Sequence, residues 1–225
     1  MLDFSSPINT AITLLSIPVI LITLSVHEMS HGYAAYKLGD PTARNLGRLS
    51  LNPLKHLDPI GALCMLFAGF GWAKPVPINT RYFKNPRRDM ALSALAGPAS
   101  NLVLGFIGVI LWSVFAKVFS LFPATTERMF YVQQLTVLFF SMFTTMNVGL
   151  AVFNLIPCPP LDGSRIFYVF LPPRFYFGVM KYERYISIAI FIALYTGALS
   201  APLGFVRSAI IDGMLWIVRL IPFLR

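Results

Sequence analysis

The stretch FSSPINTAITLLSIPVILITLSVHEMSHGYAAYKL, residues 4–38, sets the framework of the predicted fold. Its first part, from Phe4 to Val26, contains no charged side chain and is long enough to cross the roughly 30 Å hydrocarbon core of a bilayer as a helix. We predict that this helix continues to Leu38, that Pro18 bends it, and that Gly39-Asp40-Pro41 ends it. The stretch therefore predicts a membrane-spanning helix whose last turns are polar.

Those polar turns contain an HExxH box, His27-Glu28-Met29-Ser30-His31. Residues four apart share one face of a helix, so both imidazoles can point at a single metal ion. Glu28 would lie beside that ion and could accept a proton from water, which is the arrangement of a zinc hydrolase. The alternative is a pair of interfacial histidines with a glutamate that reaches the headgroups. Because ionisable groups at membrane depth usually serve a function, we predict a zinc site.

The composition points to a membrane protein. The chain is 56% hydrophobic and 12% charged, with a mean hydropathy of +0.70, whereas soluble domains carry about 25% charged residues. The net charge of +9 is spread over short loops without a nucleic-acid-binding motif, which indicates membrane orientation rather than nucleic acid as a partner. The two cysteines, Cys64 and Cys158, form no disulfide framework or CxxC pair. The start of the chain lacks a basic segment, so we expect no cleaved signal peptide.

Charge-free windows predict one integral membrane domain over residues 1–225. After the first span, the windows are residues 90–116, 129–161 and 186–206, and residues 208–224 could form a further span or an interfacial helix. The predicted fold class is all-α, a polytopic membrane protein with about four to six transmembrane helices. The catalytic core would cover about residues 8–170, and C-terminal helices would cover about residues 171–225.

Between the first two long spans we predict a re-entrant region with short strands. The polar stretch before residue 59 has strand character, and the apolar run at residues 59–73 is shorter than most spans. If this run returns to its own side, the basic loops around Arg48, Arg87 and Arg174 all face the cytoplasm, in keeping with the positive-inside rule. The N-terminus then lies outside the cell membrane, and the HExxH box lies near the cytoplasmic face.

A catalytic zinc ion usually has three protein ligands, so a residue besides His27 and His31 is needed. The candidates are His56, Asp40, Asp58, Cys158 and Asp162. Asp162 is favoured because it follows a proline-broken segment at the cytoplasmic end of the third window, where a lone carboxylate needs a partner. Its alternatives are an ion pair with Arg165 or a cap for the helix that begins near Gly163. For His56 we favour a turn-capping role, and for Cys158 a small buried thiol.

Taken together, these residues resemble the site-2 protease family of intramembrane zinc metalloproteases, in its compact form without an inserted regulatory domain. The resemblance rests on the HExxH box followed by Gly32, on Gly97-Pro98-Ala99-Ser100-Asn101, and on the segment from Asn154 to Gly163. It implies that His27, His31 and Asp162 bind one Zn2+ ion and that Glu28 activates water.

The resemblance also implies that Asn154 is a catalytic residue that supports the scissile carbonyl. From the residues alone, Asn154 needs some polar partner in an apolar window, and an interhelical hydrogen bond is the alternative. For Asn101 we favour a role in helix packing beside Gly97.

The implied function is hydrolysis of peptide bonds in transmembrane-helix substrates near the cytoplasmic side. A single-span membrane protein or a remnant signal peptide would be the substrate, the lipid bilayer is a partner, and a homo-oligomer is left open. Residues 74–79, extended by Pro75 and Pro77, could pair with an unwound substrate strand. A membrane transporter and a non-catalytic membrane scaffold are the alternatives. Transporters often have paired halves, but the broken segments at residues 59–79 and 157–160 show no similarity, which argues against a transporter; the intact Glu28 argues against a scaffold.

Overall fold

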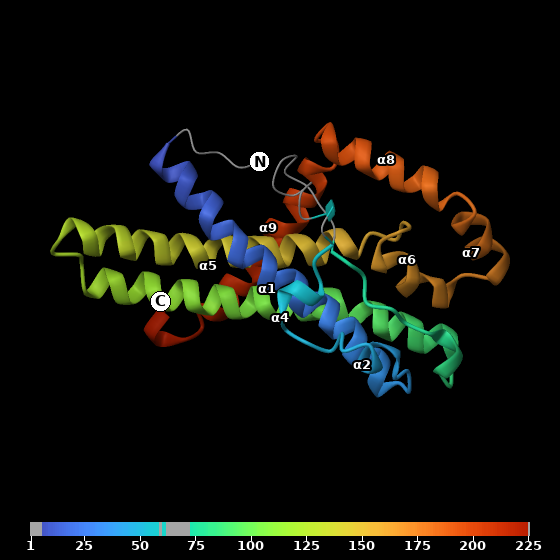
Figure 1. Ribbon diagram of the computed structural model, residues 1–225. Helices are drawn as coiled ribbons and strands as arrows, with labels where there is room; N and C mark the ends of the chain where they lie inside the picture. The colour runs from blue at the N-terminus through green and yellow to red at the C-terminus, as the bar shows by residue number, and fades with distance from the viewer. Residues whose placement is uncertain (1–5, 59, 62–72, 225) are drawn as a thin grey trace.

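The computed structural model describes residues 6–58, 60–61 and 73–224 and shows a bundle of long helices (Figure 1). Helix α4 (Pro86–Leu121) packs against α1 (Pro7–Lys37), α5 (Glu127–Asn154) and α9 (Ser200–Val218). In the described part of the chain, these four helices are the ones long and apolar enough to cross a membrane. The predicted class, an all-α multi-pass membrane protein, is therefore confirmed.

Helix α1 follows the boundaries that its sequence predicts. The side chain of Ser6 accepts a hydrogen bond from the backbone N–H of Asn9, and Pro7 occupies the first turn, where its missing N–H is not needed. The helix ends at Lys37, one residue before the predicted end, and Gly39 follows with a φ of +110° that favours glycine. Pro18 lies inside the continuous helix.

Helices α4 and α5 approach each other closely because small residues line their contact. A Cβ atom at Gly108 would lie 2.5 Å from Oγ1 of Thr144, and one at Gly105 would lie 2.7 Å from Cγ2 of Val148. Asn101 and Asn147 are fully buried in the same contact. The small residues of the second window thus allow the close helix packing that is common in lipid.

The C-terminal part differs from the predicted span at residues 186–206, which is divided between two helices, and residues 208–218 of the tail that could form a further span belong to the second of them. The chain forms α6 (Asp162–Phe167), η3 (Tyr168–Phe170) and α7 (Pro173–Met180), then α8 (Glu183–Tyr195) and α9, and it ends in η4 (Pro222–Leu224). Gly197, with a φ of +76°, ends α8, and Pro202 in the first turn of α9 begins a new helix. The membrane-capable helix is therefore Ser200–Val218, shifted toward the C-terminus.

The connection between α1 and α4 also corrects the prediction. Its polar part forms the short helix α2 (Thr42–Asn45) and the 3₁₀ turn η1 (Pro53–Lys55) instead of strands. One isolated antiparallel bridge joins Leu57 to Ala73, and η2 (Thr80–Tyr82) precedes α4. Most of the run 59–73 that we predict to be re-entrant lies outside the described residues.

The helices alternate in direction, and this alternation gathers distant segments at one end of the bundle. Figure 1 shows the N-terminal end of α1 and the turn between α4 and α5 toward one end, and α2, α6 and α7 toward the opposite end. The HExxH box in the second half of α1 and Asp162 at the start of α6 thus lie toward the same end.

Candidate active site

The two histidines of the HExxH box are buried on one face of α1. His27 and His31 are one helical turn apart, and their rings meet edge to face with centroids 4.6 Å apart. Their Nε2 atoms are 3.0 Å apart. The helical spacing thus places both nitrogens at the same point, as the sequence predicts.

Asp162 supplies a third atom at this point. Its Oδ2 lies 3.2 Å from Nε2 of His27 and 3.2 Å from Nε2 of His31, and it is buried without a hydrogen-bond donor of good geometry. The three ligand atoms all lie within 4.8 Å of one another. Among the residues described here, no ion pair joins Asp162 to Arg165, so the carboxylate faces the histidines.

The proline-broken segment after α5 brings Asp162 to the histidines. Helix α5 ends at Asn154, and a turn stabilised by the hydrogen bond from Leu161 N–H to the Cys158 carbonyl reverses the chain before α6. A Cβ atom at Gly163 would lie 2.3 Å from the carbonyl oxygen of Ile156. A glycine is needed there because any side chain would push α6, and Asp162 with it, away from α5.

The other nitrogen of each ring has an oxygen partner. Nδ1 of His31 lies 2.8 Å from the backbone carbonyl oxygen of Ser93, and Nδ1 of His27 lies 2.6 Å from Oδ1 of Asn101. Nδ2 of Asn101 donates to Oδ1 of Asn147 at 2.9 Å. An Nδ1–H that donates to oxygen leaves Nε2 with the lone pair that a metal needs.

The contact with His27 corrects our interpretation of Asn101, for which we favoured a role in helix packing alone. This residue holds a catalytic-site imidazole through a buried side-chain hydrogen bond. The available signal was a polar residue one helical turn after Gly97, in a window of otherwise small and apolar residues. Sequence alone does not show which helix face Asn101 presents to α1.

Gly97 allows α4 to approach the two rings. A Cβ atom there would lie 2.4 Å from Cε1 and Nε2 of His31 and 2.7 Å from Cε1 of His27. The backbone of α4 therefore forms one wall of the site, and a larger residue would displace both imidazoles.

The donor set fits a zinc ion. Two imidazole nitrogens and one carboxylate oxygen are ligands that catalytic zinc sites use, and they leave a coordination position for water. Burial alone would raise the pKa of the Asp162 carboxyl, but its contacts with the imidazoles of His27 and His31 outweigh burial and hold that pKa well below its ordinary value. Oδ2 of Asp162 is buried without a hydrogen-bond partner, and a cation at this point would satisfy it.

Glu28 lies next to this cluster, and its carboxylate is bonded to a segment outside the cluster. Its Oε2 accepts a hydrogen bond of 2.9 Å from the backbone N–H of Val76, in the segment that precedes η2. Its side chain is half-buried, and nothing in the described residues pairs it with a cation. Glu28 is therefore placed as a carboxylate beside the ligands rather than as a fourth ligand.

The remaining candidates lie outside the cluster. Asn154 is half-buried, and its Nδ2 donates to the Leu150 carbonyl of its own helix at 3.1 Å, so the interhelical hydrogen bond that we considered is not formed by this group. Nε2 of His56 contacts the Ser50 carbonyl oxygen at 2.6 Å, which agrees with a turn-stabilising role. Asp40 and Asp58 accept backbone hydrogen bonds, and Cys158 is a half-buried free thiol.

Replacing Asn101 by alanine should weaken zinc binding by about 10- to 100-fold, as is usual when a residue that orients a metal ligand is lost. His27 would lose its Nδ1 partner, while all three ligand atoms would remain. A competitive chelator titration of purified protein measures the change. The variant Thr144→Val, in the same α4–α5 contact but without a bond to the histidines, should bind zinc normally. Equal affinities in both variants would contradict the orienting role.

Two histidines and a glutamate on a helix of membrane-spanning length, joined by an aspartate from the short helix α6, define the chain as a membrane metallopeptidase. It belongs to peptidase family M50, whose family model matches residues 15–197. The matched range spans the HExxH box, Asn101, Asn154 and Asp162, and the family match confirms the resemblance that the sequence indicates.

Curated relatives agree with this assignment. The chain is 41% identical over 189 residues to the Bacillus subtilis (strain 168) protein named "Putative zinc metalloprotease YwhC", covering 82% of this chain and 80% of the relative. It is 28% identical over 186 residues to the Mycolicibacterium smegmatis protein named "Putative zinc metalloprotease Rip2", covering 80% of this chain and 66% of the relative. No solved structure matches the chain significantly. The chain is thus a zinc-dependent peptidase.

Proposed function

We propose that this peptidase is an intramembrane protease that cleaves transmembrane-helix substrates near the cytoplasmic face of the membrane. The observation that carries the proposal is the convergence of His27, His31 and Asp162, from two distant parts of the chain, at one end of the membrane-capable helices. These three residues would hold the zinc ion. A peptidase site on such helices is within reach of substrates that lie in the bilayer.

The distribution of basic residues supports the cytoplasmic side. The connections from α1 to α4 and from α5 to α9, residues 37–88 and 155–199, contain thirteen of the eighteen Lys and Arg residues, whereas Lys117 and Arg128 flank the turn between α4 and α5, and Arg219 follows α9. Cytoplasmic loops carry an excess of Lys and Arg. The site would then face the cytoplasmic side, and the N-terminal end of α1 would face outward.

The chemistry is divided among the residues of the site. Zinc, when bound, acts as a Lewis acid that polarises the scissile carbonyl and lowers the pKa of water. Glu28 accepts a proton from the attacking water and later returns it to the leaving amine. Asn154, whose amide now bonds within α5, would turn toward the substrate to donate a hydrogen bond to the developing oxyanion.

Residues 74–79 would receive the substrate as an added strand. A helical substrate hides its carbonyls in its own hydrogen bonds and must unwind before cleavage. This segment lies beside Glu28 through the Val76 N–H, and Pro75 and Pro77 keep it extended. A single-span membrane protein or a remnant signal peptide would thus pair with the segment next to the catalytic carboxylate.

A cysteine at position 78 should cross-link to a cysteine within a few residues of the cleavage site of a trapped substrate. Ile78 is half-buried two residues after Val76, and the trap would be a Glu28→Gln protein incubated with a single-span substrate in vesicles. Leu54→Cys, an exposed position in η1, is the control and should not cross-link near that site. Cross-linking from position 54 and none from position 78 would contradict this binding mode.

Cleavage products test the substrate class directly. The zinc-loaded protein in vesicles is incubated with single-span substrates, and mass spectrometry locates the cut. We expect the cut in the cytoplasmic half of the apolar segment, or within a few residues of it. Cuts confined to soluble loops would contradict an intramembrane protease and would leave a membrane-anchored peptidase.

A further inference from the structure

The segment Ala73–Asn79, which we call the strap, restrains the catalytic carboxylate. Its Val76 N–H donates to Oε2 of Glu28 at 2.9 Å, and the Val76 side chain is buried. A Cβ atom at Gly32 would lie 2.9 Å from Cγ1 of Val76, so the strap lies directly on α1, one turn after Glu28. The position of Glu28 therefore depends on the position of the strap.

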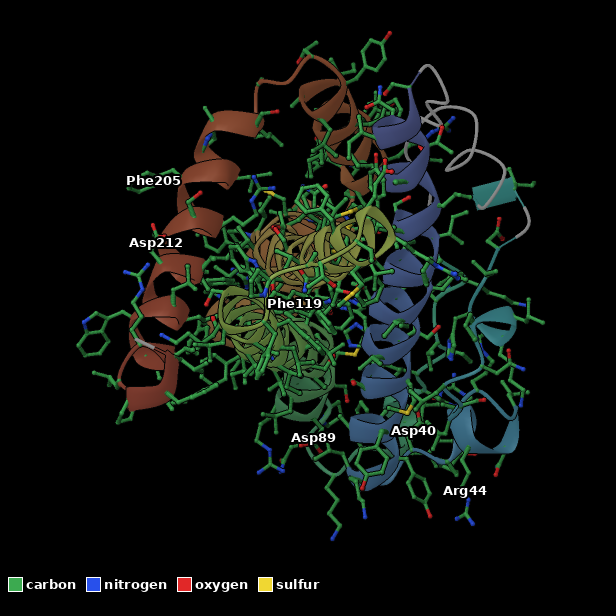
Figure 2. All side chains as sticks on the ribbon, turned by 90° about the vertical axis from the view of Figure 1, so that its left-hand side faces the viewer. Asp40, Arg44, Asp89, Phe119, Phe205 and Asp212 are labelled. Atoms are coloured by element: carbon green, nitrogen blue, oxygen red, sulfur yellow. The ribbon has the colours of Figure 1, made fainter. Side chains whose placement is uncertain are left out.

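Two buried charged residues that follow α1 hold the strap on either side of Val76. Nη2 of Arg48 donates to the carbonyl oxygen of Lys74 at 2.7 Å and lies 3.4 Å from that of Pro75. Oδ2 of Asp40 accepts a hydrogen bond of 2.6 Å from the backbone N–H of Asn79. Figure 2 labels Asp40 beside the end of α1, where α2 begins. The two contacts clamp the strap at both ends.

Asp40 also accepts the Thr42 N–H at the start of α2, but this local bond does not account for its contact with the strap or for Arg48. Asp40 is fully buried and Arg48 is 9% exposed, yet in the described residues neither forms an ion pair. Nε of Arg48 is also buried without a partner. Buried charges without an opposite charge are costly, and apolar residues of similar volume would usually be no worse for folding. Their contacts with the strap give them a function.

We propose that Arg48 and Asp40 are positioning residues of this peptidase, which act on Glu28 through the strap. Arg48 and Asp40 fix the backbone at Lys74 and Asn79, and Pro75 and Pro77 stiffen the part between them. The Val76 N–H then holds the Glu28 carboxylate in one orientation toward the reacting water. The inference rests on the proposed role of Glu28 as the base.

A double-mutant cycle tests this route of action. Val76→Pro removes the N–H that reaches Glu28, and Arg48→Met removes the clamp at nearly constant volume. We expect each variant to lower kcat by about 10- to 100-fold with zinc content unchanged, since a small misplacement of a catalytic group has effects of this size. The double variant should be no slower than the slower single variant, because both changes break the same connection.

Two further variants distinguish a positioning role of Arg48 from a general loss of protein stability. Arg48→Lys keeps a donor for the Lys74 carbonyl and should recover most of the lost kcat. Arg44→Met is the matched control, because Arg44 is exposed and bonds to the Tyr36 hydroxyl rather than to the strap (Figure 2). It should keep kcat within about twofold of the unmodified protein. Loss of zinc in Arg48→Met, or no rescue by lysine, would overturn the proposal.

Hydrogen exchange gives a readout that needs no substrate. Because residues 75 and 77 are prolines, the Val76 amide has no amide neighbour on either side, and its exchange in the full-length protein should accelerate in Arg48→Met but not in Arg44→Met. The proposal would be overturned if the two losses of kcat multiply in the double variant, or if exchange at Val76 is unchanged in Arg48→Met. Either result would leave Glu28 as the base. Full activity in Glu28→Gln would instead overturn the proposed function.

Discussion

Replacing Glu28 by glutamine should lower peptide cleavage by about 100- to 10,000-fold while zinc stays bound, because general-base catalysis contributes effects of this size. Glutamine has nearly the same shape, and its amide oxygen can still accept the Val76 N–H hydrogen bond. The amide cannot take a proton from water at neutral pH, and the three ligand atoms are untouched. The kcat on a single-span substrate and the zinc content are measured on the same preparation.

Glu127→Gln is the matched control for this experiment. Glu127 begins α5 at the end of the bundle opposite α6, so its replacement should change neither cleavage nor zinc content. Full cleavage by the Glu28→Gln protein would show that another group takes the proton, and the catalytic assignment of the HExxH glutamate would be wrong.

Replacing Asp162 by asparagine should lower zinc affinity by more than about 100-fold and cleavage with it. This loss is larger than the 10- to 100-fold effect usual for residues that only orient a ligand, because an anionic ligand itself is removed. The variant keeps the size of the side chain and the start of α6. A competitive titration with a chelator of known affinity measures the change.

The control is Asp212→Asn, which alters an exposed aspartate on α9. Figure 2 shows Asp212 on the side of α9 turned away from α4 and α5. Its zinc affinity should match that of the unmodified protein. An Asp162→Asn protein with unmodified affinity would remove Asp162 from the ligand set and reopen the choice among the other candidates.

The framework of the fold and the meeting of His27, His31 and Asp162 could be predicted from charge-free windows, helical spacing and topology. A long charge-free window predicts a span on composition alone, and α1, α4 and α5 follow their windows. The spacing of His27 and His31 fixes their shared face through helix geometry. Asp162 could be placed near them because topology, charge distribution and the proline-broken segment all indicated the same end of the bundle.

The rest depends on contacts between distant segments. Asn101 meets His27 across 74 positions, and Val76 meets Glu28 across 48, so neither contact follows from spacing in the sequence. The division between α8 and α9 was missed because hydropathy continues through Gly197, while its left-handed backbone ends the helix. The polar stretch contains the helix α2 where we predicted strands, because the Asp40 side chain accepts the Thr42 N–H and so stabilises the first turn of a helix.

X-ray absorption at the zinc K edge, on the purified full-length protein, tests the central claim most directly. The account predicts a first shell of nitrogen and oxygen only, at about 2.0–2.2 Å, with scattering from two imidazoles, those of His27 and His31. Scattering from sulfur at about 2.3 Å would indicate a cysteine ligand, Cys158 or Cys64, and a third imidazole would indicate His56. Either result would contradict a site built from two histidines and Asp162.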